Sequence, residues 1–135
     1  MADYFFFNSR DEFHRLDIAK IMYFEADGNY THIVMANKLK STVGISLTHM
    51  EKALEESLHE KARCFVRIGK SCIINVNHLA RIDVPHQQIV ITDYTQGGYQ
   101  INASKEALKT LKSIMTESVK GNKKPNLQET ENKLI

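Results

Sequence analysis

Three polar segments of the chain carry side chains that could contact phosphates or the edges of bases. Residues 27–32 (DGNYTH) combine a turn with amide, phenol, hydroxyl and imidazole groups, which can donate or accept hydrogen bonds. Residues 67–71 (RIGKS) place Gly69, which allows another backbone to approach closely, among three phosphate-binding residue types. Residues 102–105 (NASK) lie at an expected helix N-terminus, where free N–H groups favour an anion. The chemistry that these segments share is nucleic-acid binding.

Each segment also has a purely structural explanation. An ordinary hairpin with Tyr30 packed across it accounts for residues 27–32, and composition alone favours that explanation. Exposed charges on a turn account equally well for residues 67–71, and a serine cap at Ser104 is sufficient for the third segment. The binding interpretation therefore depends on the three segments acting together.

Other chemistries have little support in the sequence. It contains neither GxGxxG nor GxxxxGK[ST], and the six histidines form no HxxxH or HExxH pair. Structural thiols explain Cys64 and Cys72 better than a metal site shared with His78. A nucleophile at Ser71 or Cys72 would need His78 as its base, but no G-x-S-x-G elbow is present. We therefore expect no enzyme, no cofactor and no metal ion.

Length, composition and charge indicate one domain without a strong net charge. The 135 residues are 42% hydrophobic and 25% charged, which is typical of a globular domain. The 18 basic and 16 acidic residues give +2, and residues 120–135 hold four Lys and two Glu, so residues 1–119 are neutral. Positive potential therefore requires an uneven distribution of charge. Two cysteines without CxxC, and no secretory signal or membrane span, predict a cytoplasmic protein with reduced thiols and no membrane partner.

Short segments rich in β-branched and aromatic residues, separated by polar turns, predict an antiparallel, mainly β (α+β) fold. A turn at residues 8–11 joins two N-terminal segments into a hairpin, and residues 27–29 form a strong turn signal. The expected strands are 4–7, 12–16, 21–26, 30–35, 39–43, 65–67, 72–74, 79–84, 88–92 and 99–102.

Two amphipathic helices accompany these strands. The first covers about 47–59, with Ser46 or Thr48 as its cap and Glu51 completing a Thr-x-x-Glu box. The second begins after Ser104 and ends at Gly121. Its expected apolar face is made of Leu108, Leu111, Ile114 and Met115.

Four blocks, in this order and spacing, resemble the LytTR family of DNA-binding domains. They are IMYFEADGNY (21–30), the helix 47–58, FVRIGKSCIIN (65–75) and ASK (103–105). The resemblance covers about 17–115, and F-x-R-x-x-[KR]-S-x-I-[IV]-N is its most specific part. It implies an elongated antiparallel β fold with one helix in the middle and one at the C-terminal end. Its loops would enter successive major grooves on one face of double-stranded DNA and bend the duplex.

The resemblance implies DNA contacts in all three polar segments. Gly69 stands where the family usually has His, and Cys72 where it has an aromatic residue, so one polar contact is missing and the loop base packs differently. Lys105 replaces the usual Arg and loses bidentate geometry, so we expect a phosphate contact there. Asn75 is expected to be a buried amide bonded to the neighbouring loop. The implied contacts are Asn29, Tyr30, Thr31, His32, Arg67, Lys70, Ser71, Ser104 and Lys105.

A sequence-specific, DNA-binding transcriptional regulator of bacterial type is the function that the resemblance implies. Family members commonly carry a phosphoacceptor receiver, for which the residues before the matching region are too few, so we expect a free-standing output domain. The expected organisation is a hairpin extension (1–16), the DNA-binding domain (17–119) and a flexible tail (120–135). Residues 4–7 are expected to pack internally, the alternative being an apolar surface for a partner.

Two questions about partners stay open in the sequence. A homodimer on repeated half-sites, or a separate sensor or regulator protein, could accompany the DNA. The alternative function is a protein-interaction module of the same fold that pairs with or titrates another regulator. Two features support this alternative, namely Gly69 in place of the family's usual His and the zero net charge of residues 1–119. If DNA is the partner, basic residues should share one face and acidic residues should lie elsewhere. The basic set is Arg67, Lys70, Lys105, Lys40 and Lys123-Lys124, and the acidic set is Glu51, Glu55, Glu56 and Glu60.

Overall fold

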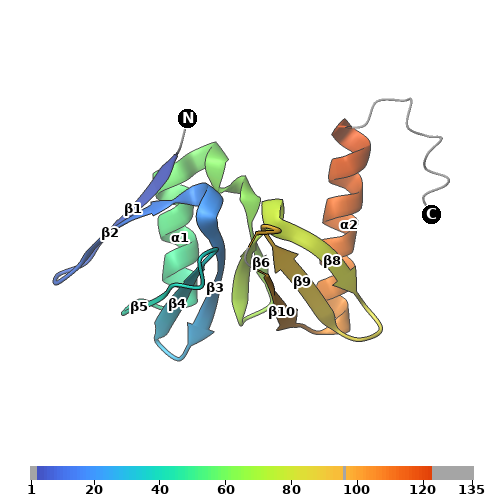
Figure 1. The fold of residues 1–135 in the computed structure, drawn as a ribbon, viewed down its shortest axis with the longest axis horizontal. Coiled ribbons are helices and arrows are strands. Elements are labelled where there is room, and N and C mark those ends of the chain that lie inside the picture. Colours follow the sequence, from blue (N-terminus) through green and yellow to red (C-terminus); the bar gives the residue numbers. More distant parts are fainter. Residues whose placement is uncertain (1–2, 96, 123–135) are drawn as a thin grey trace.

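The computed structural model describes residues 3–95 and 97–122 of the chain (Figure 1). Within these residues, three antiparallel sheets and two α-helices make up the fold. The strands are β1 (Tyr4–Asn8), β2 (Phe13–Asp17), β3 (Ile21–Asp27), β4 (Tyr30–Met35), β5 (Lys40–Val43), β6 (Phe65–Ile68), β7 (Cys72–Asn75), β8 (Leu79–Asp83), β9 (Gln88–Thr92) and β10 (Gly98–Asn102). The helices are α1 (Leu47–Leu58) and α2 (Lys105–Asn122).

The largest sheet has the strand order β5-β4-β3-β7-β6. Its first three strands form a meander, and β7 pairs with the other side of β3, with Tyr23 opposite Ile74. Because β5 and β6 lie at opposite edges, α1 must cross one face of the sheet to connect them. The remaining strands form the β1–β2 hairpin and a sheet of order β10-β9-β8.

Both faces of the largest sheet are covered, and each covering forms a core. Since neighbouring strand residues point to opposite faces, Ile73 packs into the first core and Ile74 into the second. In the first core, the β1–β2 hairpin and α1 cover the sheet through Phe5, Met50 and Leu54. The second core joins the sheet to β8–β10 and α2, and Figure 1 shows these two coverings on either side of the sheet. The second core contains Ile89, Ile91, Leu108 and Leu111.

The structure confirms the predicted strands and both helices, with ends displaced by at most one residue where they can be compared. Ser46 caps α1, because its side-chain oxygen accepts the His49 N–H, so the predicted box at Thr48 and Glu51 is wrong. The helix α2 continues one residue beyond Gly121. The rest of the expected tail, residues 123–135, lies outside the described residues.

The apolar face of α2 differs from the prediction at one position. Leu108 and Leu111 are buried and Met115 packs beside them, but Ile114 is 44% exposed. Ile114 lies at the flank of the helix, where it lines a groove together with Val66. Among the described residues, no helix is both long and apolar enough to span a membrane.

Candidate nucleic-acid interface

The three polar segments lie at one edge of the molecule. Figure 1 shows the β3–β4 turn, the β6–β7 turn and the β10–α2 junction along its lower edge. The first two lie beside each other, because the N–H of Ala26, in β3 just before the first segment, donates to the Ser71 carbonyl at 2.8 Å. Residues 66–69 and the first turns of α2, including Glu106 and Thr110, line one groove. The fold therefore brings to one edge three segments that are spread over residues 27–105 of the chain.

In the β3–β4 turn, the polar side chains divide into exposed and enclosed groups. Asn29 is exposed and Tyr30 is 56% exposed, which is more than expected for a ring packed across an ordinary hairpin. Thr31 is fully buried, and its hydroxyl donates to the Ile45 carbonyl at 2.8 Å. The Thr31 hydroxyl therefore holds the segment between β5 and α1 to β4, and the DNA contact implied at Thr31 stays a prediction.

His32 is also engaged within the fold. Its Nε2 is 2.9 Å from the Asp27 carboxylate, and its Nδ1 is 2.7 Å from the Thr42 hydroxyl. The side chain is only 16% exposed. With both ring nitrogens bonded, His32 ties the end of β3 to β5 and leaves no free nitrogen to read a base.

Arg67 shapes the β6–β7 turn from inside. Its Nε donates to the Gly69 carbonyl at 3.0 Å, and its Nη1 lies 3.0 Å from a Glu51 carboxylate oxygen. The same Nη1 lies 3.4 Å from the Thr48 hydroxyl. Thr48 and Glu51 thus hold this guanidinium instead of capping α1. The expectation that Glu51 lies apart from the basic residues is wrong, since the two charges form an ion pair.

The outer part of the same turn points to solvent. Gly69 adopts φ +59°, which is readily accessible only to glycine, and nothing lies within 4 Å of the position of a Cβ there. Lys70 and Ser71 follow it and are both exposed. The turn therefore presents a cation and a hydroxyl on a backbone that another molecule can approach closely.

The third segment is a helix start with one exposed cation. Ser104 is exposed, but its side-chain oxygen accepts the Ala107 N–H at 3.1 Å, which confirms it as a cap. Lys105, the first residue of α2, is exposed. Gln87, with φ +56°, packs against this junction because its carbonyl accepts the Ala103 N–H at 3.1 Å. No local sequence pattern predicts this contact, because it joins a turn to a junction sixteen residues farther along the chain.

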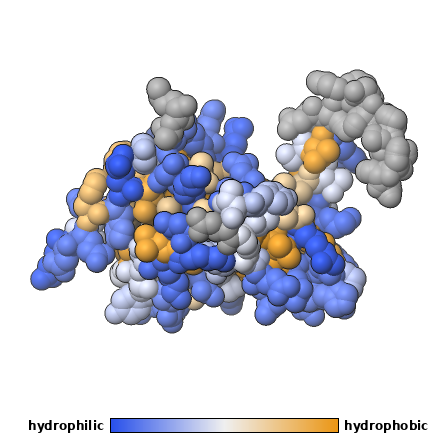
Figure 2. Space-filling model, in the orientation of Figure 1, coloured by the Kyte–Doolittle hydropathy of each residue, from blue (hydrophilic) through white to orange (hydrophobic). Residues whose placement is uncertain are grey.

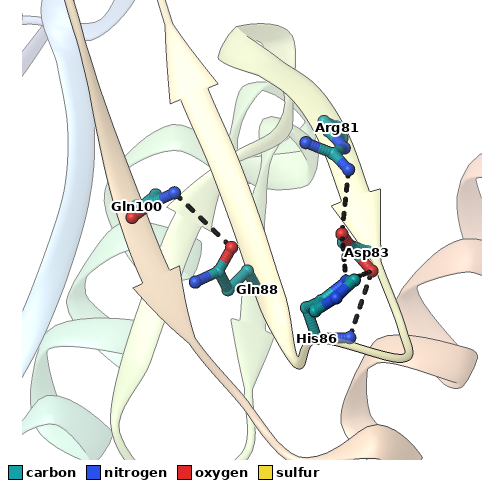
Figure 3. A network of polar contacts seen from close by, with 5 residues as sticks. All are labelled: Arg81, Asp83, His86, Gln88 and Gln100. Atoms are coloured by element: carbon teal, nitrogen blue, oxygen red, sulfur yellow. Dashed lines mark hydrogen bonds and ion pairs between the residues drawn. The ribbon is translucent and has the colours of Figure 1, made fainter.

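A polar network next to this junction holds the β8–β9 turn (Figure 3). Asp83 accepts the His86 N–H at 3.1 Å and lies 2.9 Å from Arg81 Nη2. The His86 Nδ1 lies 2.9 Å from the same carboxylate. The hydrogen bond from the His86 backbone is the largest cause that lowers the pKa of Asp83. These contacts fix the turn that carries Gln87.

Two further expectations concern buried groups beneath the turns. Asn75 is fully buried, donates to the carbonyls of Ile18 and Ile21 at 3.3 and 2.9 Å, and accepts the Asn77 N–H, as the sequence predicts. Cys72 lies in the second core and Cys64 packs against the first, so they are separate free thiols. Burial raises the pKa of the Cys72 thiol to about 11, which keeps it protonated near neutral pH.

The chain is similar to one known protein family in sequence and to one solved domain in fold. The family model described as the LytTr DNA-binding domain matches residues 11–116. A solved LytTr DNA-binding domain from Bacillus cereus is similar in fold, with a TM-score of 0.58 and 23% sequence identity over 83% of this chain and 95% of that chain. No curated protein sequence matches the chain.

Proposed function

Because the chain belongs to the LytTr DNA-binding domain family, we propose that it is a transcriptional regulator that binds double-stranded DNA sequence-specifically. In this proposal the β3–β4 turn, the β6–β7 turn and the start of α2 insert into successive grooves on one face of the duplex. The single observation that carries the proposal is the convergence of these three segments at one edge, with Lys70 and Lys105 exposed there.

The geometry divides the implied contact residues into two groups, presenting residues and positioning residues. Residues that present groups to DNA are those with exposed side chains at the edge. Residues that position them are those whose polar groups are bonded within the fold. The first group is Asn29, Tyr30, Lys70, Ser71 and Lys105. The second group is Thr31, His32, Arg67 and Ser104.

The charge distribution favours modest non-specific affinity. Arg67 is neutralised by Glu51, so Lys70 and Lys105 are the cations that the edge offers most openly to phosphates. Non-specific binding to DNA depends on the number of phosphates neutralised, and two cations neutralise few. Specificity then draws a larger share from base contacts in the grooves and from the shape of the duplex.

A salt series on a cognate fragment tests this proposal. Fragments selected by the full chain from random or genomic DNA supply the ligand. The logarithm of the binding constant should fall with the logarithm of salt concentration, by about 0.9 for each phosphate neutralised. Lys70→Ala should reduce that slope by about one unit.

Lys61→Ala is the matched control for this series. Lys61 is an exposed lysine whose partner is Asp3, beside the start of β1 and away from the three segments. Its removal should leave the slope unchanged. Equal slopes for the wild type and for both Lys70→Ala and Lys105→Ala would overturn the assignment of this edge as the DNA surface.

A second function is favoured by one observation, the ion pair between Arg67 and Glu51. Because it removes a cation from the edge, the chain could instead be a protein-interaction module that pairs with or titrates another regulator. Light scattering of the chain with and without DNA distinguishes the two functions. Failure of the chain to select any fragment from random or genomic DNA, together with a stable complex with a regulator, would establish the second.

A further inference from the structure

The strand β1 has one partner and one open edge. Within the described residues it pairs only with β2, from Tyr4 opposite Asp17 to Asn8 opposite Phe13. Figure 1 shows β1 at the outer margin of the molecule. It also lies outside the part of the chain that the family model matches, which begins at residue 11. The DNA-binding proposal therefore assigns no role to this strand.

Most strand edges in the described part of the chain are protected by charge, whereas β1 is not. Charged side chains on edge strands oppose pairing with other molecules, and β2, β5, β6 and β8 each contain at least one. The uncharged edge strand β10 is covered where it begins, because Lys38 Nζ reaches the Gly98 carbonyl at 3.4 Å and lies over the Tyr99 ring. The sequence of β1, YFFFN, has neither charge nor proline.

The outer face of the hairpin carries an aromatic pair beside one exposed cation, because Arg15 lies opposite Phe6 with its guanidinium 4.3 Å from the centroid of the Tyr4 ring. Phe6 and Phe13 are 54% and 63% exposed, and their rings stack with centroids 6.0 Å apart. Figure 2 shows an apolar patch over the hairpin. Phe5 and Phe7 point the other way and are buried against α1 and the sheet. The strand is thus held rigidly while it offers an apolar edge and face.

We propose that β1 pairs with β1 of a second copy of this chain, antiparallel, about a two-fold axis at Phe6. In this register Tyr4 faces Asn8 of the other copy and Phe5 faces Phe7, so all five residues pair. Residues directly opposite in an antiparallel pair lie on the same face, so any alternative register shifts the axis by one residue and pairs fewer of them. The two hairpins form one four-stranded ribbon.

The charges and the side-chain packing around β1 are both compatible with a second copy of the chain as the partner. Around the axis, the stacked Phe13 and Phe6 of one copy meet Phe6 and Phe13 of the other, which forms a continuous aromatic stripe. In this register Asp3, which is 2.9 Å from Lys61 of its own copy, lies opposite Ser9 of the other copy and one residue from Arg10, and the two-fold axis repeats this approach. Arg10 is 91% exposed and its closest acidic neighbour, Asp11, is 3.9 Å away, so it is available for this contact.

The interface predicts weak association in solution that DNA can strengthen. Two five-residue edges with their side chains bury less than a standard interface of about 1,600 Å². Two copies held on neighbouring half-sites have a high effective concentration, so weak pairing becomes cooperative binding. This last consequence rests on the proposed DNA-binding function, whereas the dimer itself does not.

A charge at position 6 provides the test, with the untagged full chain in sedimentation equilibrium over a concentration series. Phe6→Lys or Phe6→Glu places like charges opposite each other at the axis and should weaken dimerisation at least about tenfold. Mixing the Lys and Glu variants places opposite charges there and should restore the dimer. Leu39→Lys is the matched control, since Leu39 is 60% exposed in the β4–β5 turn. It should dimerise as the wild type does.

The outcomes separate this proposal from the function. A wild-type chain that stays monomeric at every concentration overturns the pairing, as does a Lys and Glu mixture that fails to recover. Affinity for a single half-site should be unchanged by Phe6→Lys, whereas cooperativity on two half-sites should be lost. A chain that dimerises through position 6 but binds no DNA would refute the proposed function and leave the dimer standing.

Discussion

The β3–β4 and β6–β7 turns both contain a glycine in the left-handed conformation, but the polar side chains that follow it turn into the fold in the first and toward solvent in the second. Gly28 and Gly69 adopt φ angles of +61° and +59°, and both have open space where a Cβ would lie. In the β3–β4 turn, the polar residues farther along the second strand, Thr31 and His32, turn into the fold. In the β6–β7 turn the inward role falls on Arg67, before the glycine, and the residues after it are exposed.

The difference shows that the place of a residue in the strand decides its role more than its type does. Thr31 lies within β4, opposite both Ala26 and Val43, where the pleat directs its side chain inward. Lys70 and Ser71 lie between strands, where no pleat constrains them. A polar motif therefore contains both positioning and presenting residues, and substitutions should separate the two groups.

Thr31→Val, a substitution of a positioning residue, should have the largest effect on stability. It keeps the shape of the side chain but removes the hydroxyl that donates to the Ile45 carbonyl, so it should lower the free energy of unfolding by about 1–3 kcal/mol. Ser71→Ala, in the exposed part of the other turn, should change it by less than about 0.5 kcal/mol. Urea unfolding of the two variants measures both. Equal losses would contradict the division of roles.

Much of this arrangement could be predicted from the sequence because it depends on local patterns. Period-two alternation and turn residues locate the strands, and an amide after an apolar strand identifies Asn75 as a buried bonding group. The pairing of Arg67 with Glu51 joins β6 to α1 across sixteen residues, and helix spacing at Glu51 suggested a cap instead. Ile114 fits the helical period, but the exposure of that flank depends on how closely β6 approaches α2.

A matched pair of glycine substitutions sharpens the comparison between the turns. Gly28→Ala and Gly69→Ala each force an L-residue into a left-handed conformation without a steric contact, so each should cost about 1 kcal/mol of stability. If the β6–β7 turn makes the closer backbone approach to DNA, only Gly69→Ala should also lose affinity at a temperature where both variants are folded. Binding by fluorescence anisotropy, corrected for the folded fraction, measures this. A greater loss of affinity for Gly28→Ala would reverse the assignment.

Glu51→Gln tests whether Arg67, which now positions the β6–β7 turn, can contact DNA when its ion-pair partner is removed. Without the carboxylate, Arg67 should become available to a phosphate, which would raise DNA affinity at low salt about two- to fivefold, the scale of an exposed ion pair. The salt slope should steepen by about 0.9. Glu55→Gln, on an exposed position of α1, is the control and should change neither quantity. An unchanged slope for Glu51→Gln would show that Arg67 serves only to shape the turn.

The smallest expected effect concerns Asp83, which extends the comparison to the turn beside α2 (Figure 3). Its pKa is lowered from 3.8, chiefly by the His86 backbone hydrogen bond, so its ionised form stabilises the folded state. That contribution is fully present above the pKa of the unfolded chain and is lost as pH falls through the folded pKa. The melting temperature of Asp83→Asn should therefore lie below that of the wild type at pH 7, and the difference should shrink below about pH 4. A difference independent of pH would mean that Asp83 acts through its shape and hydrogen bonds rather than its charge, unlike the charged Arg67 in the β6–β7 turn.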